Sequence, residues 1–195
     1  MGGLAVALTA TLAGQSAAAS SRALYFDNQG EPGQTSCSAA YVLVQKSTHG
    51  HPCGHVIAVA QGTGYTYTDQ YISTTKSTGF RLDARRHVTG TIYLSSYPYV
   101  NIETGSGGVL PSPPGPLGAK VVVYVNNVAI GTANGSGVAT PNGTVAFPVD
   151  LTIPRSLNRK VVKQVIAEVS YTSGLGVTSV SYAPGSASVL NFPSA

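Results

Sequence analysis

Three of the four histidines of this chain, and one of its two cysteines, fall within residues 49–55. Imidazole and thiolate groups are the usual ligands of zinc and copper. On an extended strand, alternate residues share one face, so His49, His51 and His55 would point the same way together with Cys53. Gly50, Pro52 and Gly54 favour a turn instead. A metal site on the three histidines is therefore one interpretation, and no other motif in the sequence requires a cofactor.

The two cysteines, Cys37 and Cys53, favour a second interpretation of the same region. In an exported protein a single pair of cysteines predicts a disulfide, because the compartment is oxidising and only one connectivity exists. Closing a loop of this length stabilises the fold by about 3 kcal/mol in the chain-entropy model. The bridge would remove the Cys53 thiolate from any metal site, so the sequence favours a disulfide next to a histidine-rich turn.

Tyrosine is the most abundant aromatic residue, with 11 Tyr against 4 Phe and no Trp. Exposed aromatic rings stack on sugar faces, and rings near strand ends can be presented by loops. The alternative is that tyrosine simply suits strands, where it buries its ring and leaves its hydroxyl in water. The sequence predicts a ligand-binding platform at Tyr65, Tyr67, Tyr97 and Tyr99.

Catalytic motifs are missing from the sequence. The seven carboxylates are scattered, and the chain contains no nucleophile elbow, zinc-protease helix, phosphate loop or dinucleotide fingerprint. A triad assembled by the fold would escape this search. We expect a protein that is not an enzyme.

Basic residues cluster at residues 81–86 and 155–163, but without the density or the aromatic residues of a nucleic-acid surface. Solvated strand ends account for both groups, and weak attraction to anionic cell-wall polymers is the functional alternative. The sequence predicts no nucleic-acid partner.

The N-terminal residues 1–19 carry no charge and resemble a secretory signal. An apolar run at residues 4–13 precedes Ala17-Ala18-Ala19, which suits signal peptidase and places cleavage after Ala19. The basic residue that normally precedes such a run is missing. The run is shorter than the about 20 apolar residues that span a bilayer. We therefore expect an extracellular protein, secreted or associated with the cell surface, without a transmembrane span.

The elements that must position these residues are strands. Alternating apolar residues indicate half-buried strands, most clearly over residues 87–94 and 165–171, and Asn126-Asn127 indicates a two-residue hairpin turn. A single helical turn is expected over residues 154–158. Residues 134–143 are predicted as a turn, and residues 40–45 are expected to pair antiparallel with residues 55–60. The sequence predicts an all-β fold: an antiparallel β-sandwich of jelly-roll or immunoglobulin-like type, with about ten strands.

Residues 105–118 are rich in proline and glycine and predict a crossover loop that is neither helix nor central strand. One sandwich domain over residues 20–195 is favoured, and two small β domains, 22–104 and 119–195, are the alternative.

The predicted function is non-catalytic binding or adhesion to a glycan or cell-wall polymer. The alternatives are a structural or accessory exported domain without a small ligand, and a histidine-based metal-binding protein.

Overall fold

The computed structural model describes residues 20–28, 41–46, 55–56, 65–97, 99–100, 109–110, 115–139, 143–173, 177–180 and 187–195. Its regular elements are strands and two short 3-10 turns, η1 (Thr75–Ser77) and η2 (Arg155–Leu157). The strands are β1 (Ser21–Asn28), β2 (Tyr41–Val44), β3 (His55–Val56), β4 (Tyr65–Ser73), β5 (His87–Tyr97), β6 (Tyr99–Val100), β7 (Val109–Leu110), β8 (Gly115–Val125), β9 (Val128–Ala139), β10 (Thr144–Thr152), β11 (Val165–Ser173), β12 (Val177–Val180) and β13 (Val189–Pro193). The all-β prediction is confirmed.

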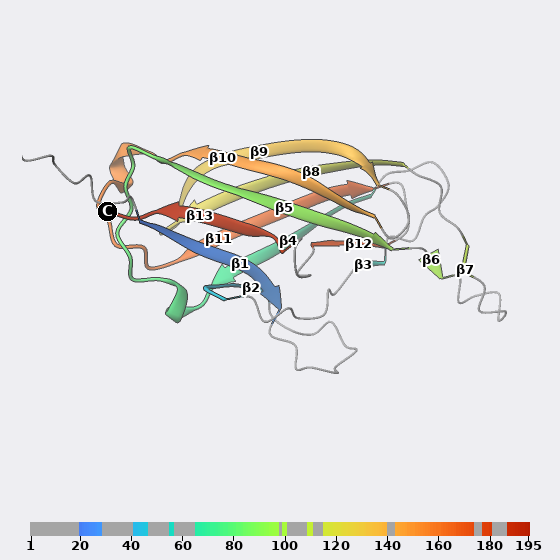
Figure 1. Ribbon diagram of the computed structural model, residues 1–195, viewed down its shortest axis with the longest axis horizontal. Coiled ribbons are helices and arrows are strands. Elements are labelled where there is room, and N and C mark those ends of the chain that lie inside the picture. Colours follow the sequence, from blue (N-terminus) through green and yellow to red (C-terminus); the bar gives the residue numbers. More distant parts are fainter. Residues whose placement is uncertain are drawn as a thin grey trace, which may run out of the picture.

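Eleven of the strands form one continuous sheet (Figure 1). Its order runs β9-β8-β11-β4-β2-β1-β13-β5-β10. β12 pairs with β5 beyond β13, and β3 pairs with β12. The sheet curls until its edge strands β9 and β10 lie close together. The expected sandwich is therefore a single curled sheet. It is also mixed, because β2 and β4 run parallel.

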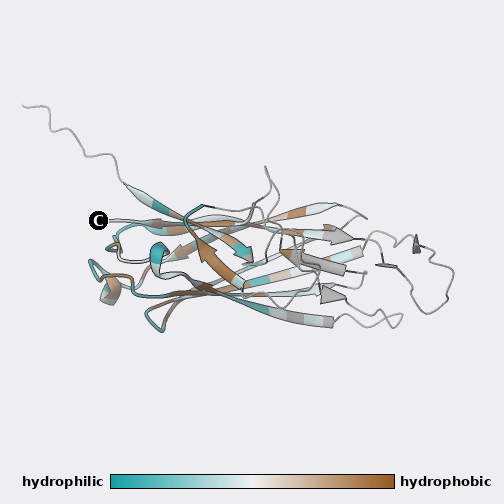
Figure 2. Cartoon of the chain, turned by 90° about the horizontal axis from the view of Figure 1, so that it is seen from below, coloured by the Kyte–Doolittle hydropathy of each residue, from teal (hydrophilic) through white to brown (hydrophobic). Residues whose placement is uncertain are grey.

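One core fills the inside of this curled sheet. Strand alternation supplies it: Val88, Ile92 and Leu94 on β5 are fully buried, while the residues between them are exposed or half-buried. On β11, Val165, Ala167, Val169 and Tyr171 are buried in the same way. The two predicted amphipathic strands are confirmed. Figure 2 shows hydrophobic positions along the strands and hydrophilic segments around the end of the sheet where the C-terminus lies.

The chain before and after residues 105–118 contributes neighbouring strands to this sheet. β4 pairs with β11, β5 pairs with β10, and β1 pairs with β13. A single cluster of buried residues draws on strands from both parts of the chain.

The hairpin predicted at Asn126-Asn127 is confirmed between β8 and β9. Both asparagines have positive φ, 49° and 66°. Two successive positive-φ residues match the twist of the strands they connect, and asparagine tolerates this conformation better than most residues. The helical turn expected over residues 154–158 is also present, as η2.

The turn predicted at residues 134–143 is wrong for residues 134–139, which continue β9. The glycines there serve close packing. A Cβ on Gly135 would lie 2.3 Å from Phe147 Cδ1, and one on Gly137 would lie 2.6 Å from Val145 Cγ1. Glycine therefore lets β9 approach the side chains of β10 where the sheet nearly closes on itself.

The loop expected at residues 105–118 is shorter than predicted, because β8 begins at Gly115. Pro116 lies in the strand opposite Val138 of β9. On its other side, the last described pair between β8 and β11 joins Leu117 to Ser173. Pro116 thus lies near the start of β8, outside the described β8–β11 pairing, and the end of a strand is a position where proline is tolerated.

The expected pairing of residues 40–45 with residues 55–60 is also wrong for the described positions. β2 has β1 on one edge and β4 on the other, and β3 pairs with β12. Because both edges of β2 are already occupied, β3 has no edge of β2 to join.

Candidate binding site

Two segments far apart in the sequence, residues 79–87 and 153–164, meet at one end of the curled sheet. Gly79 and Val162 are joined by a backbone hydrogen bond from Gly79 N to Val162 O (2.8 Å). Leu82 N donates to Lys160 O (3.2 Å), and Arg159 N donates to Leu82 O (2.8 Å). β5 begins and β10 ends here, on the side of the C-terminus in Figure 1.

This end collects most of the positive charge of the protein. It carries seven of the 11 lysines and arginines, three from the first segment and four from the second. Six are exposed and Arg86 is half-buried. These residues are Arg81, Arg85, Arg86, Arg155, Arg159, Lys160 and Lys163, which we call the basic end. The sequence shows them as two separate groups, and the hydrogen bonds between the segments bring them together.

The backbone around η2 explains why the cationic side chains face outward. Ile153 and Leu157, four residues apart, are buried and anchor the segment to the core. Arg155 lies between them on the exposed side. Arg159 has a φ of 56° and turns the chain back toward Leu82. The apolar anchors thus fix where the guanidinium groups project.

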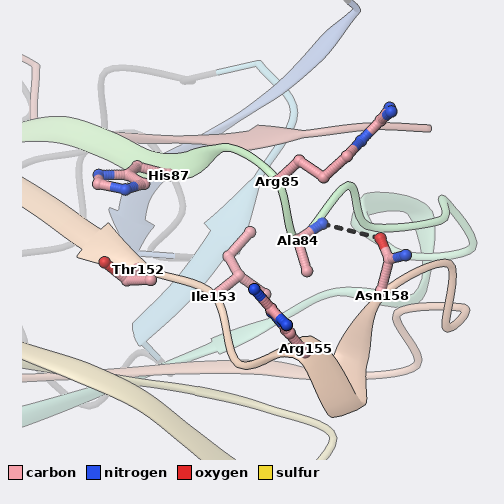
Figure 3. Close-up of a pocket in the computed structure, with 7 residues that line it drawn as sticks. All are labelled: Ala84, Arg85, His87, Thr152, Ile153, Arg155 and Asn158. Atoms are coloured by element: carbon pink, nitrogen blue, oxygen red, sulfur yellow. Dashed lines mark hydrogen bonds between the residues drawn. The ribbon is translucent and has the colours of Figure 1, made fainter.

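A groove with a volume of about 520 Å³ lies within the basic end (Figure 3). Its lining residues are Ala84, Arg85, His87, Thr152, Ile153, Arg155 and Asn158. In Figure 3, Arg155 extends back toward Ile153, whereas Arg85 points away from the other lining residues. Asn158 Oδ1 accepts a hydrogen bond from Ala84 N (3.0 Å), which leaves its amide nitrogen as a donor.

The guanidinium group of Arg85 is held by Asp83. Arg85 Nε donates to Asp83 Oδ1 (2.9 Å), and Nη2 donates to Oδ2 (3.1 Å). The backbone N–H of Arg85 also donates to Oδ1 (3.1 Å). The hydrogen bonds from the Arg85 side chain are the main cause that lowers the pKa of Asp83, and the same contact raises the pKa of Arg85. This acidic group is thus already paired and repels an incoming anion less than a free carboxylate would.

His87 and Asp150 form a second pair at the rim of the groove. His87 Nδ1 lies 2.5 Å from Asp150 Oδ1, and both side chains are well exposed, at 49% and 69%. Asp150 pairs with Thr89 and Thr152 pairs with His87 across β5 and β10, so all face outward on neighbouring strands. Spacing along the chain could not reveal this pair, because only the register between β5 and β10 creates it.

The His87–Asp150 pair does not come with catalytic partners. Among the residues that the structure describes, no hydroxyl group donates a hydrogen bond to His87, and its side chain is about half exposed to solvent. A catalytic base normally has a nucleophile within hydrogen-bond reach and a site that excludes water. Nothing in the described part of the chain indicates catalysis.

The chemistry that the groove offers is anion binding. Arg155 supplies a planar fork of N–H donors, the Asn158 amide and the Thr152 hydroxyl supply neutral donors, and Ile153 forms an apolar floor. Fixed donors in a positively charged surface suit carboxylate, sulfate or phosphate groups.

Most of the site residues predicted from the sequence lie outside the residues that the structure describes. Cys37, Cys53, His49 and His51 belong to undescribed residues, and His55 is described only as a backbone position in β3. The disulfide and the histidine metal site stay predictions. Within the described ranges, no three His, Cys, Asp or Glu residues are grouped so that they could hold a metal ion.

The four predicted tyrosines are described only as backbone positions. Tyr65 and Tyr67 open β4, Tyr97 closes β5, and Tyr99 opens β6. These positions lie at the end of the sheet opposite the basic end (Figure 1). The platform there remains a prediction.

Comparison with known proteins gives no family for this chain. No family model matches it, and no curated protein matches it. In the Gt strain of infectious bursal disease virus, a solved chain is 12% identical, with a TM-score of 0.27 over 86% of this chain and 42% of that chain. A mutant VP2 protein of the same virus is 11% identical, with a TM-score of 0.28 over 86% of this chain and 45% of that chain.

The Gx strain structure is 14% identical, with a TM-score of 0.28 over 87% of this chain and 45% of that chain. This chain thus spans less than half the length of these viral chains. Similarity at this level assigns neither a family nor a function. In the described part of the chain, no helix is long and apolar enough to cross a membrane.

Proposed function

We propose that this protein is an extracellular, non-catalytic binding protein whose basic end attaches it to an anionic cell-wall polymer or acidic glycan. The observation that carries the proposal is the meeting of two distant segments, which concentrates seven cationic side chains at one end of the sheet, two of them lining a groove there. Both carboxylates described there, Asp83 and Asp150, are already paired. A net charge of +4 at pH 7 adds long-range attraction for an anionic partner.

A repeating polymer suits this surface better than a small anion. The cationic side chains are mostly exposed, and an exposed ion pair contributes only about 0.2–1 kcal/mol. A chain with regularly spaced acidic groups can engage several of them at once, which raises its effective concentration at each next contact. The expected binding is therefore multivalent, and its affinity falls as salt screens the charges.

The proposal is tested by co-sedimentation of the protein with an acidic polysaccharide and with an uncharged one, in low and high salt. The wild-type protein is expected to bind the acidic polymer, and to lose it as salt rises above about 0.15 M, where the screening length is about 8 Å. Arg155→Gln and Lys160→Gln are each expected to weaken binding by about two- to fivefold.

Lys120→Gln is the matched control. Lys120 is exposed in the middle of β8, away from the basic end, and the substitution removes the same charge. Equal losses for Lys120→Gln and Arg155→Gln would show that only net charge matters. Binding of the uncharged polymer alone, or equally tight binding of double-stranded DNA, would contradict the proposal.

A further inference from the structure

The outer face of β4 and β11 carries a row of hydrogen-bonded polar pairs across the two strands. The hydroxyls of Thr66 and Thr172 share a hydrogen bond (2.8 Å), as do those of Thr68 and Ser170 (2.7 Å). The next pair brings Gln70 Nε2 to Glu168 Oε1 (3.1 Å). Each side chain is held by its neighbour, so this face presents polar groups in fixed positions.

Tyr124 on β8 extends this row to a third strand. Its hydroxyl donates to Glu168 Oε2 (3.3 Å). The residue directly opposite Tyr124 on β11 is Ile166, and Glu168 lies two residues further along. A side chain that reaches the diagonal neighbour must lean along the sheet. The Tyr124 side chain therefore extends along the outer face of the sheet toward Glu168, and it is only partly buried there.

Glu168 is fixed at both of its oxygens, one by Gln70 and one by Tyr124. Desolvation is the main cause that raises the pKa of Tyr124, and the charge of Glu168 and the hydrogen bond to it act in the same direction. The phenol therefore remains a neutral donor to the carboxylate. Each carboxylate oxygen keeps a lone pair for a further hydroxyl group.

Beside this pair the surface is hollowed by about 300 Å³, lined by Tyr124, Asn127, Ile166 and Glu168. Asn127 is held by the β8–β9 turn, where its φ is 66°. The hollow combines an aromatic ring, an aliphatic side chain, an amide and a carboxylate oriented by two hydrogen bonds. Carbohydrates need this combination, because a sugar ring has an apolar C–H face and hydroxyls around its rim.

We propose that this hollow binds an uncharged sugar ring that stacks on Tyr124 and donates hydroxyl hydrogen bonds to Glu168. Asn127 and Gln70 would hold further hydroxyls. A sugar ring fits better than a metal cation, because the hollow offers a single carboxylate beside an aromatic and an aliphatic side chain, whereas hard cations take about six or more oxygen ligands. The site uses none of the residues of the basic end and does not depend on the proposed anion binding.

The test is calorimetric titration of the full chain with uncharged hexasaccharides of glucose and of N-acetylglucosamine, in low and high salt. Saturable binding of at least one of them, unchanged by salt, is expected. Tyr124→Ala should weaken it about tenfold, since the stacked ring is lost. Tyr124→Phe keeps the ring and should weaken it less than about threefold.

Two further variants test which side chains contribute to sugar binding. Glu168→Gln keeps an acceptor oxygen, so a partial loss of sugar affinity is expected, and unchanged affinity would contradict the hydrogen bonds assigned to Glu168. Tyr93→Ala removes a half-buried tyrosine from β5 and should leave affinity unchanged.

If neither sugar binds, or if wild type and Tyr124→Ala bind equally well, the proposed sugar site is overturned. Arg155→Gln, which tests the basic end, is expected to bind the sugar with wild-type affinity. The two proposed sites can therefore be rejected independently.

Discussion

Asp83 is the residue whose ionisation most directly supports the basic end. It accepts three hydrogen bonds from Arg85, and these lower its pKa below the ordinary value of 3.8. A carboxyl group with a lowered folded-state pKa stabilises the protein above its unfolded-state pKa, and this stabilisation is lost as the pH falls through the folded value. Asp83→Asn should therefore be less stable than wild type near neutral pH, and the difference should shrink between about pH 5 and pH 2.

Urea unfolding at several pH values measures this difference. Arg85→Lys is the companion variant, because it keeps the positive charge but loses the bidentate hydrogen bond to Asp83. It should show a smaller but parallel effect. A stability difference for Asp83→Asn that stays constant down to the lowest pH would contradict the role assigned to the carboxylate.

Cys37 and Cys53 carry a second prediction at the level of residues. If the exported chain forms the predicted bridge, thiol titration under denaturing conditions should find no free thiol, and metal analysis should find no bound metal. Reduction should lower stability by about 3 kcal/mol. Two free thiols with one equivalent of metal would instead support the site at His49, His51 and His55.

At the level of elements, the contact between β9 and β10 depends on glycine. A Cβ on Gly135 would lie 2.3 Å from Phe147 Cδ1, on a ring that is itself buried in the core. Gly135→Ala should therefore destabilise the protein by about 1–3 kcal/mol, because overpacking forces the ring or the strand to move.

Gly118→Ala in the neighbouring strand β8 is the control for this prediction. No atom lies within 4 Å of the position its Cβ would take. The substitution should be neutral or stabilise by up to about 1 kcal/mol, because alanine restricts the unfolded chain. Thermal unfolding compares the two variants, and equal effects would rule out the close contact as the cause.

For the whole molecule, the order of strands predicts how the chain unfolds. β4 pairs with β11, and β5 pairs with both β10 and β13, so the two parts of the chain share one sheet and one core. Scanning calorimetry should show one transition whose calorimetric and van't Hoff enthalpies agree. Two separate transitions, or a stable fold of residues 22–104 alone, would favour two domains.

The sequence by itself determined the strand alternation and the hairpin turn of this protein. Alternation over residues 87–94 and 165–171 predicts half-buried strands, since the burial of a strand residue follows from which face it occupies. Asn126-Asn127 predicts the hairpin for a similarly local reason: the turn needs two positive-φ residues, and its own side chains permit them. The all-β class follows from features of this kind.

Only the tertiary structure decided what lies next to what. Residues 134–139 look like a turn until Phe147 and Val145 of β10 are seen against Gly135 and Gly137. The basic groups at 81–86 and 155–163 look unrelated until the backbone of Leu82 is paired with that of Lys160. Tyr124 and Glu168 likewise meet through the register of β8 and β11. These contacts join residues distant in sequence, and local preferences carry no information about which distant strand becomes a neighbour.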